Sequence, residues 1–138
     1  IKIQKLNNAR KNDDGLVVIV STIDNYNVIL PADASYKYID YNGYTSFHGL
    51  VATHHGAATH NCLDNIPLCS EFHTIAYSYG KNNFLEHPTA LSIGEHYKQG
   101  WKNIKETPEG HIVLGAYVGI GKVPCYGRLK WCSLGNTQ

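Results

Sequence analysis

Short runs of apolar residues, and stretches in which apolar and polar residues alternate, make up most of the chain and predict β-strands. The apolar run Leu16–Val20 predicts a buried strand, and Asn27–Leu30 predicts a short strand that ends at Pro31. Residues 72–79 alternate between apolar and polar and stop at Gly80, which is typical of a strand with one buried face.

Two β-hairpins are expected from turn signals that lie between strand-like segments. Asn42-Gly43 separates the segments 36–41 and 44–53, and this dipeptide favours a tight hairpin turn. A glycine-rich turn likewise separates 111–118 from 124–131. Both pairs are predicted to be antiparallel.

Residues 89–104 form the one window with helical character. Gly94 and Gly100 interrupt it, and glycine disfavours the interior of a helix. We therefore predict two strands here, at 88–93 and 96–104, and an all-β fold with little helix.

The two predicted hairpins echo each other. Gly43 and Gly49 follow Pro31 at nearly the spacing at which two later glycines follow Pro108, namely Gly121 and Gly127. Phe47-His48-Gly49 then corresponds to Cys125-Tyr126-Gly127. This spacing indicates a duplicated β unit.

Composition and charge limit the kinds of binding partner that we expect for this protein. The 138 residues predict a single domain over 1–138, and a net charge of +1 without a basic stripe argues against a nucleic-acid partner. No apolar run approaches the length of a membrane span. The chain begins at Ile1, contains no methionine and has four cysteines, a combination that predicts a secreted, extracellular protein.

Several motifs of the chain resemble the DM-nine repeat, which occurs in tandem in invertebrate proteins, some of them mannose-binding lectins. The matching motifs occur in this order: Pro31-Ala32-Asp33-Ala34, Asp40-Tyr41-Asn42-Gly43, Phe47-His48-Gly49, His54-His55-Gly56-Ala57-Ala58-Thr59 and Ala76-Tyr77-Ser78-Tyr79-Gly80, followed by Trp101, Pro108, Gly115, Gly121 and Tyr126-Gly127-Arg128. The resemblance covers about residues 27–135, with a first repeat at 27–80 and a second at 97–135.

The resemblance implies an all-β fold of two intertwined, pseudo-symmetric antiparallel units. The N-terminal strand at 16–20 would complete the second unit. In lectin members an acid of the hairpin turn and a downstream lysine bind the sugar. Asp40 matches the acid, and His60-Asn61-Cys62 stands where the lysine is expected, so that His60 would act as the donor.

The residues around Asp40 have the chemistry of a sugar site. Aromatic rings cover the C–H faces of a sugar, and carboxylate and amide groups bind its hydroxyls. We therefore predict a ligand site made of five residues: Tyr38, Asp40, Asn42, Tyr44 and His60. Alternatively, the tyrosines of this region simply cover the sheet, because tyrosine is a good strand former.

The sequence contains only weak signs of a catalytic site. His48, His54, His55 and His60 lie close together in sequence and allow a histidine-dependent metalloenzyme as an alternative, although no HExxH motif occurs. We expect no catalytic residue, metal or cofactor.

The four cysteines are expected to form disulfides. If 124–131 is a strand, Cys125 and Cys132 are roughly 23 Å apart and cannot bond each other. We therefore expect a disulfide from Cys62 or Cys69 to Cys125 or Cys132.

Together these features predict a secreted, lectin-like carbohydrate-binding protein of the recognition or innate-defence type. Glycans or glycoproteins are the expected partners, with mannose-type glycans and a homodimer as candidates. A secreted protein-interaction or toxin-like module that binds no sugar is the main alternative.

Overall fold

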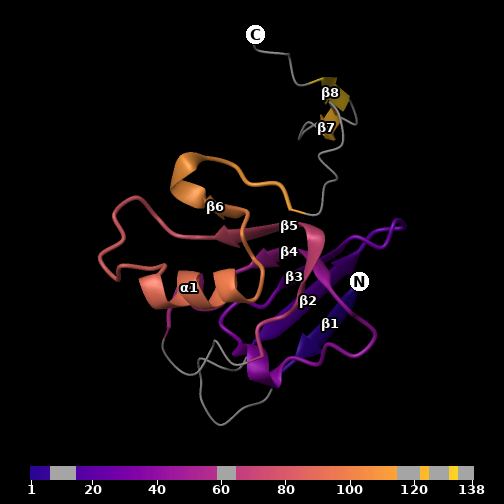
Figure 1. The fold of residues 1–138 in the computed structure, drawn as a ribbon, viewed down its shortest axis with the longest axis horizontal. Helices are drawn as coiled ribbons and strands as arrows, with labels where there is room; N and C mark the ends of the chain where they lie inside the picture. Colours follow the sequence, from indigo (N-terminus) through magenta and orange to yellow (C-terminus); the bar gives the residue numbers. More distant parts are fainter. Residues whose placement is uncertain (7–14, 59–64, 115–121, 125–130, 134–138) are drawn as a thin grey trace.

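The computed structural model describes residues 1–6, 15–58, 65–114, 122–124 and 131–133. A six-stranded sheet forms its centre (Figure 1), with strands β1 (Lys2–Lys5), β2 (Leu16–Ser21), β3 (Asn27–Leu30), β4 (Phe47–Val51), β5 (Cys69–Tyr77) and β6 (Ile104–Glu106). The helix α1 (Ala90–Lys98) and short 3-10 turns, among them η2 (Tyr36–Tyr38), η3 (Thr53–Gly56) and η5 (Thr107–Glu109), connect the strands. A separate antiparallel pair is formed by β7 (Lys122–Pro124) and β8 (Trp131–Ser133).

The strands follow one another across the sheet in the order of the sequence. β1, β2 and β3 are antiparallel neighbours, whereas β3, β4, β5 and β6 are parallel neighbours. Each parallel pair requires a connection that returns to the starting edge of the sheet. The segments 31–46, 52–68 and 78–103 are these connections.

The described residues of all three connections pack on the same face of the sheet. Parallel crossovers that share one hand and advance in one direction must lie on one face. The buried core joins sheet residues to residues of the three connections: Val17, Ile19, Ile29, Leu50, Ile75 and Tyr77 from the sheet, and Ala34, Tyr36, Ile39, Ala52, Ile66 and Trp101 from the connections. On the opposite face Leu114 packs against the bare backbone of Gly49 beside Val28.

The predicted all-β antiparallel fold is wrong, since three of the five strand pairings in the sheet are parallel and residues 90–98 are helical. Thr89 caps the helix by accepting a hydrogen bond from the Ser92 N–H, and Ser92 and His96 are fully buried. A cap and a packed face together outweigh the roughly 1 kcal/mol cost of Gly94 in the helix interior. The predicted strands at 88–93 and 96–104 are therefore replaced by α1 and β6.

The predicted hairpin over 36–53 is also wrong. Residues 36–38 form η2 instead of a strand, and the following strand is limited to β4. Asn42-Gly43 does form a tight turn, in which Tyr44 N–H donates to Tyr41 O at 2.9 Å and Gly43 has φ +90°. This turn lies inside the connection between two parallel strands.

Other strands agree with the sequence more closely. β2 and β3 coincide with the predicted strands, and β5 overlaps 72–79. β2 pairs with β1 and β3 in the six-stranded sheet.

The second predicted hairpin is only partly described. Residues 111–114 form no strand, while Gly121 and Gly127 lie outside the described residues. The antiparallel pair found here is β7 with β8.

No helix in the described part of the chain is long and apolar enough to cross a membrane.

Two glycine substitutions test the backbone, one in the helix α1 and one in the turn η3. Gly94→Ala is expected to raise the free energy of unfolding by about 1 kcal/mol, because nothing lies within 4 Å of the added methyl group and alanine favours a helix interior. Gly56→Ala is the contrasting variant, because its φ is +86° and its methyl group would lie 2.5 Å from Pro88. We expect it to lose about 2 kcal/mol or more. Urea unfolding measures both, and a destabilising Gly94→Ala would contradict the helix.

Candidate functional site

Asp40, the predicted sugar-binding acid, makes contacts inside the molecule. One carboxylate oxygen accepts a hydrogen bond from Asn42 N–H at 2.9 Å, and the other forms an ion pair with the Lys2 ammonium at 3.0 Å. The Gln4 side chain bonds both the N–H and the carbonyl of Asp40. The hydrogen bond from Asn42 and the contact with Lys2 hold the pKa of the Asp40 carboxyl below its usual value. Asp40 thus fastens β1 to the 39–44 turn.

The other predicted site residues are distributed differently. Tyr44 stacks on Phe47 with ring centroids 5.4 Å apart, as part of the core margin. Tyr38 lies on η2 with 41% of its surface exposed, and the Lys37 ammonium is 4.9 Å from its ring centre. Asn42 is exposed beside Asp40, and His60 lies outside the described residues. The predicted site is therefore brought together only in part.

The predicted disulfides are not seen. Cys69 is a free thiol whose pKa is raised by burial. Cys62 and Cys125 lie outside the described residues, and Cys132 is in β8.

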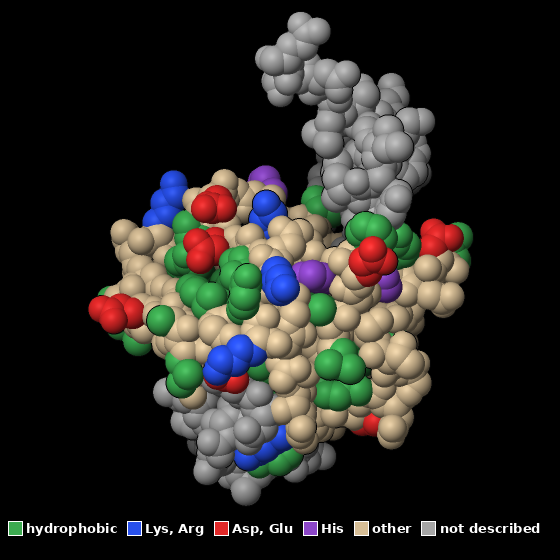
Figure 2. Space-filling model, in the orientation of Figure 1, with side chains coloured by type: hydrophobic (Ala, Val, Ile, Leu, Met, Phe, Trp, Pro, Cys, Tyr) green, Lys and Arg blue, Asp and Glu red, His purple; other side chains and the backbone are tan. Residues whose placement is uncertain are grey.

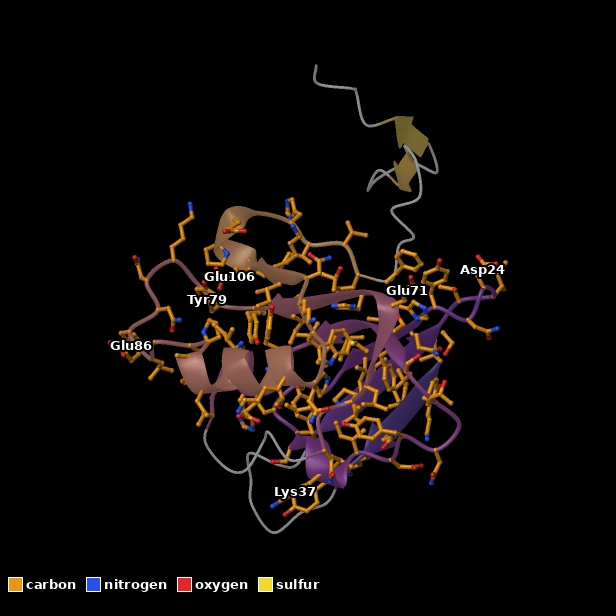
Figure 3. The ribbon with its side chains drawn as sticks, viewed as in Figure 1. Asp24, Lys37, Glu71, Tyr79, Glu86 and Glu106 are labelled. Atoms are coloured by element: carbon orange, nitrogen blue, oxygen red, sulfur yellow. The ribbon has the colours of Figure 1, made fainter. Side chains whose placement is uncertain are left out.

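A different set of polar residues gathers at one edge of the sheet. The parallel strands β4, β5 and β6 run in the same direction, so the residues at their carboxyl ends lie along one edge of the sheet. We take residues at and just beyond these ends as the candidate site. Figure 3 shows Tyr79 and Glu106 together at this edge. We call His55, Tyr79 and Glu106 the carboxyl-edge site.

The turn after β4 has an unusual backbone. His54 and His55 have φ values of +47° and +56°, a left-handed conformation that few residues other than glycine adopt, and Gly56 follows with φ +86°. Its neighbours hold this turn: His54 N–H donates to Ala32 O at 3.2 Å, and Thr89 N–H donates to Gly56 O at 3.0 Å. Such strain persists only where surrounding contacts enforce it, and it often occurs at functional sites.

The left-handed turn gives His55 a defined orientation. Its ring Nδ1 lies 2.5 Å from the carbonyl oxygen of Ser78, and because a carbonyl only accepts, Nδ1 carries the proton in this bond. In the neutral ring, Nε2 is then the basic nitrogen. Since the His55 side chain is exposed, Nε2 is available to a ligand.

Tyr79 and Glu106 form a pair at the ends of β5 and β6. Thr107 fixes Tyr79 by accepting its N–H at 2.8 Å and donating to its carbonyl at 2.7 Å. Burial, a hydrogen bond to Glu106 and the negative charges of Glu106 and Glu109 all raise the pKa of the Tyr79 hydroxyl. The phenol therefore stays protonated beside a carboxylate.

Behind this edge, the buried ring of His96 contacts residues of η2, β5 and α1. His96 Nδ1 donates to Ser92 O at 2.7 Å, so Nε2 accepts from the Tyr36 hydroxyl at 2.9 Å, and the Tyr77 hydroxyl lies 3.1 Å from Nδ1. The Tyr36 oxygen also accepts the Thr53 N–H, immediately before the left-handed turn. Burial lowers the pKa of His96 to about 4, so the ring is neutral at pH 7.

Sequence reasoning missed Tyr79, Glu106 and His96 as site and support residues. Gly80 marked the end of β5, but the nearness of Glu106 follows only from the parallel pairing of β5 with β6. His55 was considered as a metal ligand or as one of a group of ligand-contacting histidines, and was not among the predicted site residues. Within the described ranges, no three His, Cys, Asp or Glu side chains lie close enough to hold a metal ion.

His96 makes stability depend on pH in a defined direction. Its pKa is about 4 in the folded state and 6.5 when unperturbed, so the unfolded chain binds more protons between these values. Stability is therefore full above pH 6.5 and falls by up to about 3 kcal/mol as the pH drops to 4. Urea unfolding between pH 7 and 4 measures this loss.

The control variants use two histidines in different surroundings. His96→Gln should remove the loss of unfolding free energy between pH 6.5 and 4. The matched control replaces the exposed His111 by Gln and should keep that loss. A His96 ring that titrates near pH 6.5 by NMR would contradict the assignment.

Comparison with known proteins assigns no family. No protein-family model, no curated protein and no solved structure matches the chain. The relation to the DM-nine repeat stays a prediction, whereas the all-β fold that it implies is wrong.

Proposed function

We propose that the chain is a carbohydrate-binding recognition protein and that the sugar binds at the carboxyl-edge site. The observation that carries the proposal is the pairing of Tyr79 with Glu106, at the edge of the sheet where His55 also lies. The extracellular location stays a prediction from the sequence.

The three side chains supply complementary parts of sugar recognition. The Tyr79 ring offers an apolar face for C–H groups, and its hydroxyl both donates and accepts. The Glu106 carboxylate accepts hydrogen bonds from sugar hydroxyls, and the basic Nε2 of His55 accepts another. Sites of this kind combine an aromatic surface with a few fixed polar groups.

The backbone around these residues is already ordered. Thr107 fixes Tyr79 on one side, and the Ser78 carbonyl fixes the His55 ring on the other. A ligand that meets ordered groups loses less binding free energy to their immobilisation. This supports a binding site made from strand ends.

The Asp40 turn is the weaker place for a sugar. Both carboxylate oxygens of Asp40 already have partners, Asn42 and Lys2. A sugar hydroxyl would share these oxygens with the Asn42 N–H and the Lys2 ammonium, which already use part of their hydrogen-bonding capacity. The two locations can be separated by experiment.

The test compares substitutions at the two locations. Wild-type protein is first applied to an array of mannose-, galactose- and N-acetylglucosamine-terminated glycans, and the strongest binder is titrated by calorimetry. Glu106→Gln should weaken binding roughly ten- to a hundredfold, because a hydrogen bond to a charged group is worth about 1.5–3 kcal/mol. Tyr79→Ala should weaken it similarly, and Tyr79→Phe, which keeps the ring, should weaken it less.

Asp40→Asn and Tyr38→Ala are the matched controls and should bind like wild type. Urea midpoints establish that each variant is folded. Loss of binding in Asp40→Asn with no loss in Glu106→Gln would move the site to the 39–44 turn. Absence of binding to every glycan would overturn the proposal.

A further inference from the structure

The loop between β5 and α1 presents two large apolar side chains to solvent. Phe84 is 88% exposed and Leu85 is 60% exposed, and Leu91 in the first turn of α1 is 59% exposed. Isolated exposed apolar residues are ordinary, whereas adjacent ones at a loop tip indicate an interaction surface. We propose that this tip, Phe84-Leu85, is an anchor that inserts into a lipid layer.

The tip has an ordered backbone, as an anchor requires. Phe84 N–H donates to Asn82 O and Glu86 N–H donates to Asn83 O, both at 3.2 Å. The Asn83 side chain bonds the His87 carbonyl and closes the loop. The apolar side chains thus remain exposed on a closed turn whose hydrogen bonds are made locally.

The shape of the tip favours a lipid layer. Figure 3 places Glu86 at the outer end of the molecule, beyond Tyr79, and Figure 2 shows apolar side chains beside acidic ones at this end. A protruding pair of apolar side chains can insert into a soft layer that has no shaped pocket, and Phe and Leu are among the residues that interfacial helices bury in such a layer.

The charge around the tip predicts which lipids it accepts. Lys81 and Glu86 flank Phe84 and Leu85 and carry opposite charges. Attraction to anionic lipids requires an excess of basic residues near the surface. The anchor should therefore bind zwitterionic and anionic vesicles alike, with little dependence on salt. The proposed anchor is separate from the proposed sugar site and does not depend on it, although both lie at the same end of the molecule in Figure 3.

Flotation of the full chain with phosphatidylcholine vesicles tests the anchor. Wild-type protein should float with the vesicles. The double variant Phe84→Ser with Leu85→Ser should lower the partition coefficient at least about tenfold, because serine buries much less apolar surface in the lipid than Phe or Leu. Added phosphatidylserine or high salt should change wild-type binding little.

Ile23→Ser is the matched control, because Ile23 is 98% exposed and next to Asp24, which Figure 3 shows at the opposite end from Glu86. It should bind like wild type. Absence of wild-type binding, or an equal loss in Ile23→Ser, would overturn the anchor. Glu106→Gln, which tests the sugar site, should float normally, so failure of one proposal is distinguishable from failure of the other.

Discussion

The buried imidazole of His96 joins four segments that are distant in the sequence. It bonds Tyr36 of η2 and Ser92 of its own helix, lies against Tyr77 of β5, and through the Tyr36 hydroxyl reaches Thr53 after β4. In the neutral ring with its proton on Nδ1, Nδ1 donates to Ser92 O and Nε2 accepts from the Tyr36 hydroxyl. Burial makes this neutral form the stable one. A partly satisfied network in the core would be costly, so these four segments take up their positions together.

The order of the parallel strands determines where a ligand can meet the sheet. Because β3, β4, β5 and β6 follow one another, their connections all lie on the core face and their carboxyl ends share one edge. Residues at the ends of adjacent parallel strands are therefore neighbours although they are distant in the sequence, as His55 and Ser78 are, and Tyr79 and Glu106. The left-handed turn at His54 and His55 belongs to the same edge. Gly56 permits it, because Pro88 and Tyr77 leave no room there for a methyl group.

Local sequence patterns predicted where several strands form, but the pairing of the strands that we inferred from them was wrong. Leu16–Val20 and Asn27–Leu30 are strands because apolar β-branched runs bounded by turn residues have few other stable forms. Whether neighbouring strands are parallel depends on the connections, which local alternation does not encode. Asn42-Gly43 is a real turn in a connection between parallel strands, and Gly94 is tolerated in a helix because Thr89 caps it and His96 is buried. In both cases tertiary contacts overrode local propensity.

Asp40 and Glu106 show why residue type alone did not locate the site. Both are acids near tyrosines, and the sequence pointed to Asp40. Its carboxylate has a local partner, Asn42, that the turn motif implies, and a distant one, Lys2, that only the pairing of the N-terminal strand brings near. Glu106 instead is the last residue of the short edge strand β6, and its hydrogen-bonding partner is the neutral hydroxyl of Tyr79. A carboxylate beside a neutral hydroxyl can bind a ligand without sharing its oxygens with a cation, whereas Asp40 would share them with Lys2. The same reasoning applies to His55, whose Nδ1 has a backbone partner while Nε2 of the exposed ring is the acceptor of the neutral form. The carboxyl edge thus holds the polar groups whose bonding capacity the fold itself does not use up.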